Sequence, residues 1–294
     1  MSQRAAPRVK AYLQLMRLPN VFTAIADIVA GYVMVRGFAV SIAELGALVL
    51  ATSGIYAAGC VLNDFCDREV DARERPSRPL PSGVVSGREA LLLTFFLFAA
   101  GIFGAYLAGP ASFFLALAIV LLVIVYDTRS KQHDIVGPLN MAACRAGNLL
   151  LGMSPALALS LPLLFPLVSF FYIFLVTVFS RLETEGNAAS QAWWMAGGIA
   201  GIFLLFAVLA ARGDIKVDAF IYLVLLACLV LPPLRKAFRQ STPQAVQQSV
   251  RSLILAIPFL DAAYAASMQG AVAGLPVVFC LLPALLIARF FYVT

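Results

Sequence analysis

The chain has 294 residues, of which 62% are hydrophobic and only 12% are charged. Soluble domains carry about 25% charged residues, so this composition excludes an ordinary soluble protein and predicts a polytopic membrane protein. The formal net charge of +6 does not indicate nucleic-acid binding, because the basic residues are distributed among short loops rather than gathered in one patch. The five cysteines form no C-x-x-C pair, so neither a disulfide framework nor a zinc site is predicted.

Ten apolar runs follow one another, and most approach the roughly 20 residues that a membrane-spanning helix needs. They cover residues 21–36, 43–62, 88–108, 110–126, 139–160, 163–180, 191–211, 217–234, 251–268 and 274–292. The first run lacks a convincing cleavage site, so we expect a retained helix rather than a signal peptide. No polar segment is long enough to form a second core. We therefore predict an all-α, multi-pass bundle of nine or ten transmembrane helices, with residues 1–294 in a single membrane-embedded domain.

The lysines and arginines predict how the runs cross the membrane. If the N-terminus is cytoplasmic and every run crosses, 17 of the 21 basic residues fall on one side. The positive-inside rule makes that side the cytoplasm. The polar segments after runs two, four and six all open to it, so three loops are available to build one site.

Arg17 and Asn20 lie just before the first run, at the expected start of its helix, and the run itself contains Asp27. Charged residues inside a membrane segment are rare, because a charge at the bilayer centre costs about 2.5–3.5 kcal/mol on insertion scales. Asp27 is therefore a functional candidate by default.

The second run ends in a polar stretch, residues 63–83, that is rich in carboxylates and arginines. Asn63, Asp67 and Asp71 are spaced i, i+4, i+8, and Asp64, Asp67 and Asp71 are spaced i, i+3, i+7. Either set lines one face of a continuing helix. Like charges on one face repel one another, which indicates a bound cation, and hard oxygen ligands suit Mg²⁺. Arginines just downstream suit the oxygens of a polyphosphate.

The fourth and fifth runs add further polar groups. The fourth ends in Y-D-T-R-S-K, from Tyr126 to Lys131, which on spacing alone also fits juxtamembrane anchors. In the fifth, Asn140 and Asn148 share a helix face by i+4 steps, and Arg145 lies beside that face. Arg145 is expected either to reach a diphosphate or to pair with an acidic residue, and an interhelical hydrogen-bond network is the structural alternative.

The N-D-x-x-D-x-x-x-D spacing from residue 63, and R-P-x-R-P-L-P-S-G from residue 75, resemble the first aspartate-rich motif of the UbiA superfamily of intramembrane prenyltransferases. The L-P-N-V-F-T-A, C-R-x-x-N-L-L-L-G-M-S and S-R-x-E-x-x-G segments resemble its EboC-like bacterial branch. The superfamily resemblance covers nearly the whole chain. It implies a central cavity open to the cytoplasm of a bacterial plasma membrane. It also implies Mg²⁺-dependent transfer of a prenyl group from a prenyl diphosphate to a small aromatic or other lipophilic acceptor, among membrane lipids.

The same resemblance implies roles for individual residues. The implied metal ligands are Asn63, Asp67, Asp71, Glu183 and Glu185, and the implied catalytic residues are Asp67, Asp71 and Lys131. The implied substrate-binding residues are Arg17, Asn20, Asp64, Arg75, Arg78, Tyr126, Arg145 and Asn148.

The second motif departs from the family pattern. Glu183 stands where the family has an aspartate, Glu185 matches, and Asn187 replaces the final aspartate. Because Asn187 lacks the negative charge of the family's aspartate, the sequence leaves open whether the second motif binds a second metal ion. Two other functions also fit the raw features: a transporter with a carboxylate site at the bilayer midplane, and a prenyl-lipid-binding protein without turnover. The position of the acidic clusters at helix ends favours the enzyme over the transporter.

Overall fold

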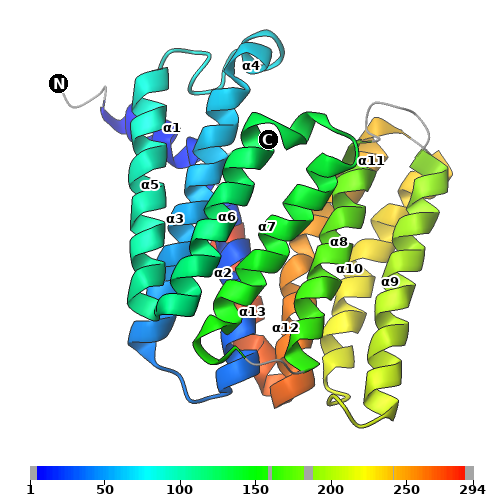
Figure 1. Cartoon of the computed structure of the whole chain (residues 1–294). Helices are drawn as coiled ribbons and strands as arrows, with labels where there is room; N and C mark the ends of the chain where they lie inside the picture. Colours follow the sequence, from blue (N-terminus) through cyan, green and yellow to red (C-terminus); the bar gives the residue numbers. More distant parts are fainter. Residues whose placement is uncertain (1–4, 158–160, 182–187, 241, 289–294) are drawn as a thin grey trace.

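The computed structural model describes residues 5–157, 161–181, 188–240 and 242–288, and all regular elements in those ranges are helical (Figure 1). The α-helices are α1 (Ala5–Leu15), α2 (Leu18–Arg36), α3 (Ile42–Cys66), α4 (Arg68–Glu74), α5 (Gly87–Ala108), α6 (Pro110–Thr128), α7 (Val136–Met153), α8 (Leu164–Ser180), α9 (Ala188–Ala211), α10 (Ala219–Gln240), α11 (Pro243–Leu255), α12 (Ile257–Gln269), α13 (Leu275–Phe279) and α14 (Leu281–Ala288).

Eight helical segments in the described ranges are long and apolar enough to cross a membrane. They are Arg8–Arg36, Ile42–Cys66, Gly87–Ala108, Pro110–Thr128, Leu161–Ser180, Trp193–Ala211, Ala219–Gln240 and Pro243–Gln269. The helix α7, which carries more polar residues, would be a ninth membrane-spanning helix, and the shorter apolar segment Ala271–Ile287 would be a tenth. The predicted number of nine or ten helices is reached when one or both of these segments are included. The prediction of an all-α membrane bundle is confirmed.

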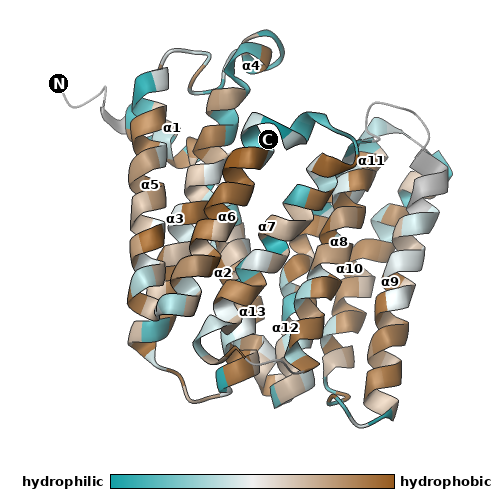
Figure 2. Ribbon diagram, in the orientation of Figure 1, coloured by the Kyte–Doolittle hydropathy of each residue, from teal (hydrophilic) through white to brown (hydrophobic). Residues whose placement is uncertain are grey.

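Hydrophilic residues are most frequent at one end of the bundle, with fewer at the other end and in the middle (Figure 2). That end, at the top of Figure 1, carries α4, the end of α6 and the beginning of α7. The helix ends there are fixed by capping: Ser86 and Glu89 form a capping box at the start of α5. Glu89 also pairs with Arg8 of α1, which ties the N-terminal helix to α5. Leu15 of α1 also belongs to one hydrophobic cluster with Val61 of α3 and Ala90 of α5.

Helices α2 and α7 cross in very close contact in the middle of the bundle. A Cβ atom added to Gly31 would lie 2.5 Å from the carbonyl oxygen of Leu149, and one added to Gly152 would lie 2.6 Å from that of Ile28. Only glycine permits such an approach, and small residues at helix contacts are typical of membrane bundles. The crossing brings the polar residues of α2 against those of α7.

Candidate active site

The end of α3 and the start of α4 present the acidic motif. The helix α3 ends at Cys66 and α4 begins at Arg68, yet the backbone N–H of Asp67 donates to Asn63 O at 3.0 Å and that of Asp71 to Asp67 O at 2.8 Å. The i, i+4, i+8 spacing predicted from the sequence is therefore kept across the junction.

Arg17 approaches this motif from the turn between α1 and α2. Its backbone is left-handed, with φ 45° and ψ 50°, the one non-glycine residue with positive φ in the described ranges. Its Nη2 donates to Asp64 Oδ1 at 2.9 Å and lies 3.5 Å from Asn63 Oδ1. A non-glycine residue costs energy in this region, and such residues cluster at functional sites. The conformation holds the predicted substrate-binding arginine against the acidic motif.

Arg78 joins the two most buried carboxylates of the motif. Its Nη1 lies 2.7 Å from Asp71 Oδ2 and 3.5 Å from Asp64 Oδ1. Asp64 and Asp71 are 6% and 3% exposed, whereas the side chain of Arg75, 4.0 Å from Asp71 Oδ1, is 53% exposed. A buried carboxylate needs a compensating charge, and Arg78 supplies it while Arg75 remains open to solvent.

Lys131 and Asp127 approach the motif from the end of α6. Lys131 Nζ lies 2.6 Å from Asp67 Oδ1, and Asn63 Nδ2 donates to Asp127 Oδ1 at 2.9 Å. Tyr126 is half-buried beside Asp127. The structure thus brings predicted residues from the segment after α3 and from the segment at the end of α6 into one cluster.

Arg181, directly after α8, contacts the segment between α6 and α7 that contains Lys131. Arg181 Nη2 donates to Lys131 O at 2.9 Å, and its Nη1 lies 3.2 Å from Asp134 Oδ1. Gly137 makes room for this arginine, because a Cβ there would lie 2.4 Å from Arg181 Nη2. The predicted ligands Glu183 and Glu185, with Asn187, lie outside the described residues, so their roles stay predictions.

A second polar cluster lies deeper in the bundle. Asn148 Nδ2 donates to Asp27 Oδ2 at 2.7 Å and to Ala24 O at 2.8 Å, while its Oδ1 accepts from Thr52 at 2.7 Å. Arg145 Nε lies 2.8 Å from Asp27 Oδ2, and its Nη2 donates to the backbone oxygen of Thr23 at 2.7 Å. The pairing of Arg145 with an acidic residue, one of the two alternatives from the sequence, is therefore present. Asn20 is half-buried in the first turn of α2, where its backbone oxygen accepts a hydrogen bond from the Thr23 hydroxyl at 2.8 Å.

Two acidic residues of these clusters were not nominated from the sequence. Asp127 is 4% exposed. It follows the apolar run 110–126 on the membrane side where the acidic motif is predicted to lie, and this position could have nominated it as a site residue. Asp261, 1% exposed, lies inside the apolar run 251–268 and 4.0 Å from Arg145 Nη2. A charge inside an apolar run is the signal that singled out Asp27, and it applied equally to Asp261.

The donor chemistry of the acidic motif fits Mg²⁺, since carboxylate and amide oxygens are its preferred ligands. Within the described residues, however, no three acidic, histidine or cysteine side chains form a metal-holding group. The carboxylates of Asp64, Asp67 and Asp71 are instead each paired with arginine or lysine. A metal ion would therefore have to share or replace these cationic partners.

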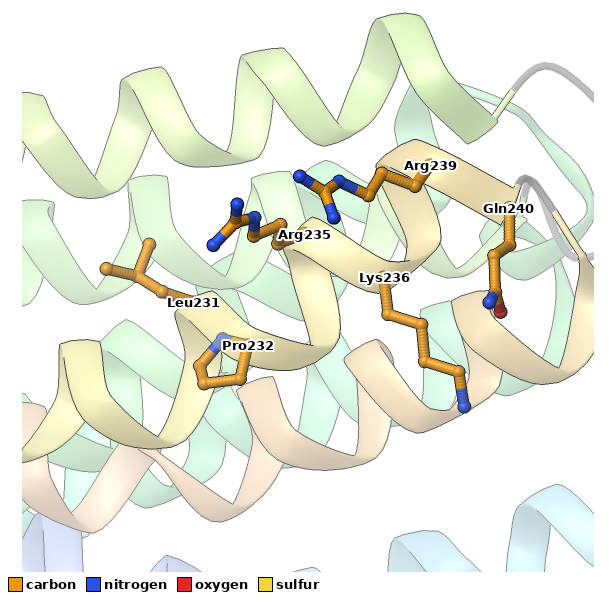
Figure 3. Close-up of a pocket in the computed structure, with 6 residues that line it drawn as sticks. All are labelled: Leu231, Pro232, Arg235, Lys236, Arg239 and Gln240. Atoms are coloured by element: carbon orange, nitrogen blue, oxygen red, sulfur yellow. The ribbon is translucent and has the colours of Figure 1, made fainter.

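A separate basic groove lies at the end of α10 (Figure 3). Its lining residues are Leu231, Pro232, Arg235, Lys236, Arg239 and Gln240. Arg235 and Arg239 extend to one side of the helix, and Lys236 extends to the other, where it donates to Gln248 Oε1 at 3.1 Å. The groove shares no residue with the sequence-predicted site, and its charges fit the basic juxtamembrane ends expected of a membrane protein.

Residues 24–147 match the model of the UbiA prenyltransferase family. Digeranylgeranylglyceryl phosphate synthase of Sulfurisphaera tokodaii is 34% identical over 138 residues, which are 47% of this chain and 50% of that protein. The synthase of Metallosphaera sedula is 34% identical over 141 residues, 48% of this chain and 50% of that protein. The chain thus spans about half the length of the curated relatives it matches.

Solved structures extend the likeness of the fold over most of the chain. A structure from work on digeranylgeranylglyceryl phosphate synthase in membranes has a TM-score of 0.66, covering 89% of this chain and 99% of that one at 16% identity. A UbiA homologue from Archaeoglobus fulgidus, bound to GPP and Mg²⁺, has a TM-score of 0.57, covering 92% and 99% at 13% identity. The predicted UbiA resemblance is confirmed, whereas the EboC-like branch stays a prediction.

Proposed function

We propose that this chain, which carries a UbiA-family region at residues 24–147 within a UbiA-like fold, transfers a prenyl group from a prenyl diphosphate to an acceptor in the membrane. The observation that carries the proposal is the convergence of Arg17, Arg78 and Lys131 on one acidic motif at a helix end. Carboxylates with closely held cations suit a substrate that arrives as a metal-bound diphosphate. A midplane transporter site would not need this cluster.

The position of each residue suggests whether it would bind the metal ion or the diphosphate. Asn63, Asp67 and Asp71 would hold Mg²⁺, with Glu183 and Glu185 as the further predicted ligands. Bound Mg²⁺ would neutralise the charge that develops on the departing diphosphate. Arg75 is the arginine of the cluster with the most exposed side chain, at 53%, so it is available to a phosphate oxygen.

Further cations would stabilise the same leaving group. Lys131 is held beside Asp67 by a loop that Arg181 fixes, so its ammonium is preorganised for a phosphate oxygen. Arg17, Asn20, Asp64, Arg78 and Tyr126 complete the proposed donor site.

The acceptor would enter deeper in the bundle, beside Arg145 and Asn148. Asp27 of that cluster is seven residues beyond Asn20 on α2, which places it about 10 Å further from the donor site. The solved homologues bound to GPP or DMAPP support a prenyl diphosphate donor. The names of the relatives favour a glyceryl phosphate acceptor, a narrower class than the small aromatic or other lipophilic acceptor expected from the sequence. We further propose that the site faces the cytoplasm, an orientation that the distribution of basic residues supports, and that the membrane is a bacterial plasma membrane.

The test is release of diphosphate and formation of a prenylated product by the purified chain. Geranyl and geranylgeranyl diphosphate would be offered with a prenylglyceryl phosphate, a hydroxybenzoate or a membrane-lipid extract. Asp67→Asn should lower turnover roughly 100-fold or more, as removal of one group that stabilises transition-state charge does. Because Asp67→Asn also removes the carboxylate beside the Lys131 ammonium, whose side chain is 14% exposed, thermal unfolding of the variant must show that it still folds.

Glu69→Gln is the matched control, since it makes the same acid-to-amide change on α4 at a side chain that is 82% exposed. It should keep wild-type turnover. Diphosphate release that survives both a chelator and Asp67→Asn would contradict the metal-assisted mechanism. A wild-type protein that binds labelled donor without releasing diphosphate would favour a lipid-binding protein.

A further inference from the structure

The basic groove at the end of α10 carries charge that its flanking helices do not balance. The sequences of α9, α10 and α11 contain no aspartate or glutamate. Arg235 and Arg239 are exposed, and within the described ranges neither of them pairs with a carboxylate. Lys236 is also exposed, and its ammonium donates to the amide oxygen of Gln248. The groove therefore presents three cations without an anion from the part of the chain that the structure describes.

The two arginines are placed to act together. They are four residues apart on α10, which puts them on one face of the helix and about 6 Å apart along its axis. Arg235 and Arg239 extend to the same side of α10, whereas Lys236 extends to the other (Figure 3). A guanidinium group donates two parallel hydrogen bonds to phosphate oxygens, so this pair can hold one phosphate-bearing headgroup.

The groove is apolar at its membrane-facing end. The helix α10 rises to the end of the bundle that carries α4, so Leu231 lies one turn closer to the middle of the membrane than Arg235 does (Figure 1). Leu231 is 46% exposed, and Val224 and Leu225, which precede it on α10, are 51% and 44% exposed. An anion without a hydrocarbon chain would leave this apolar surface unused, whereas an amphiphile would use both parts.

Two exposed tryptophans mark the depth of the groove in the membrane. Trp193 and Trp194, on α9, are 64% and 74% exposed. The ring of Trp193 packs edge-on against Phe238 of α10, with centroids 5.0 Å apart, so the pair of tryptophans lies beside the end of α10. Tryptophan is enriched at the level of the lipid headgroups. The groove is therefore expected at the depth where lipid phosphates lie.

We propose that the basic groove binds the headgroup of an anionic phospholipid from the membrane leaflet on the side of the acidic motif. The phosphate oxygens would accept hydrogen bonds from Arg235 and Arg239, and the acyl chains would lie along Leu231 and the exposed apolar residues before it. The groove offers about 520 Å³, within the range of about 300–1,000 Å³ that is typical of small-molecule sites. Basic pockets between transmembrane helices bind anionic headgroups in this way. The lipid would bind whether or not the chain transfers prenyl groups.

The test uses the tryptophans as its probe, because the sequence contains only these two. The purified full chain would be placed in vesicles of phosphatidylcholine and phosphatidylglycerol, with brominated acyl chains on one lipid or the other, and quenching of tryptophan fluorescence would be measured. Two arginines should give phosphatidylglycerol a preference of roughly 30-fold over phosphatidylcholine. Arg235→Gln or Arg239→Gln alone should lower this preference roughly fivefold, and the double variant should lower it to less than threefold. Salt at 1 M should weaken the wild-type preference.

The matched control is Arg212→Gln with Lys216→Gln, which removes the same charge from exposed side chains at the opposite end of α9 and α10. It should keep the wild-type preference. Equal quenching of the wild type by the two brominated lipids, or a preference that survives in the double arginine variant, would overturn the proposal. Glycerol phosphate, which has no acyl chains, should not displace phosphatidylglycerol. Displacement at equal concentration would instead assign the groove to a water-soluble phosphate compound.

Discussion

Arg78 is the charge that keeps Asp64 and Asp71 buried together, and replacing it by methionine isolates that effect. Methionine removes the charge and retains an unbranched side chain. In Arg78→Met, Asp64 keeps Arg17 at 2.9 Å, whereas the basic residue that remains beside Asp71 among the described residues is Arg75 at 4.0 Å. Breaking a buried ion pair by removing one partner costs about 3–5 kcal/mol, because the other charge stays buried without compensation.

The loss should appear in thermal unfolding of the purified chain in detergent. A change of 1 kcal/mol moves the midpoint by roughly 2–4 °C for a domain of 150–250 residues, so a fall of roughly 6–20 °C is expected for Arg78→Met. Arg75→Met is the control: that side chain is 53% exposed and its contact is longer, so its loss should cost less than about 1 kcal/mol.

Mg²⁺ should then restore part of the lost stability in Arg78→Met. With Arg78 gone, the motif carries an uncompensated carboxylate and offers free oxygen ligands to a cation. At a concentration 100-fold above its Kd, a ligand that binds the folded state alone adds about 2.7 kcal/mol. In the wild type the same Mg²⁺ should shift the midpoint less, because the carboxylates are already paired. Equal falls for Arg78→Met and Arg75→Met, or no Mg²⁺ shift in Arg78→Met, would refute this reasoning.

Two further predictions concern the topology and the second motif. Reporters fused after residue 80, 132 or 240 should be cytoplasmic and one in the loop 212–216 external, as measured by enzymatic reporter activity; reporters at 132 and 214 on the same side would contradict the threading. Glu183→Ala and Glu185→Ala should each abolish donor turnover in the diphosphate-release assay, and Asn187→Asp should tighten the dependence on Mg²⁺, because it adds the charge that the family pattern has. Unchanged turnover in both alanine variants would exclude this segment as a metal ligand.

The helices could be predicted because apolar length is a local property. Within the described residues, each of the ten predicted runs is largely helical, and the run 139–160 contains most of α7 despite its polar residues. The internal breaks could not be predicted. The run 251–268 is interrupted at Ala256, before Pro258, and the run 274–292 at Cys280, before Pro283. A membrane helix either tolerates a proline or breaks at it, and packing against neighbours decides between these outcomes.

The acidic motif could be predicted because its spacing lies within one helix and the next. Arg75 and Arg78 follow the motif closely, but two other cationic partners are distant in the sequence: Arg17 contacts Asp64 from 47 positions away, and Lys131 contacts Asp67 from the segment after α6. The family resemblance nominated Arg17 and Lys131, but Asp127 was not nominated. The partner of Asn63 depends on how α3 and α6 pack, and no periodicity within either segment contains that information.

The two polar clusters differ in charge balance, and this difference assigns them different tasks. In the donor site, Asp64, Asp67, Asp71 and Asp127 face an equal number of cations, namely Arg17, Arg75, Arg78 and Lys131. A balanced cluster gains little from a metal ion alone or from a diphosphate alone, but it accommodates both together because their charges largely cancel. In the deeper cluster, two carboxyl groups face one guanidinium, and the apolar surroundings give the excess charge no solvent. The donor site is therefore suited to a metal-bound anion, whereas among the described residues the deeper cluster keeps an excess of acidic groups.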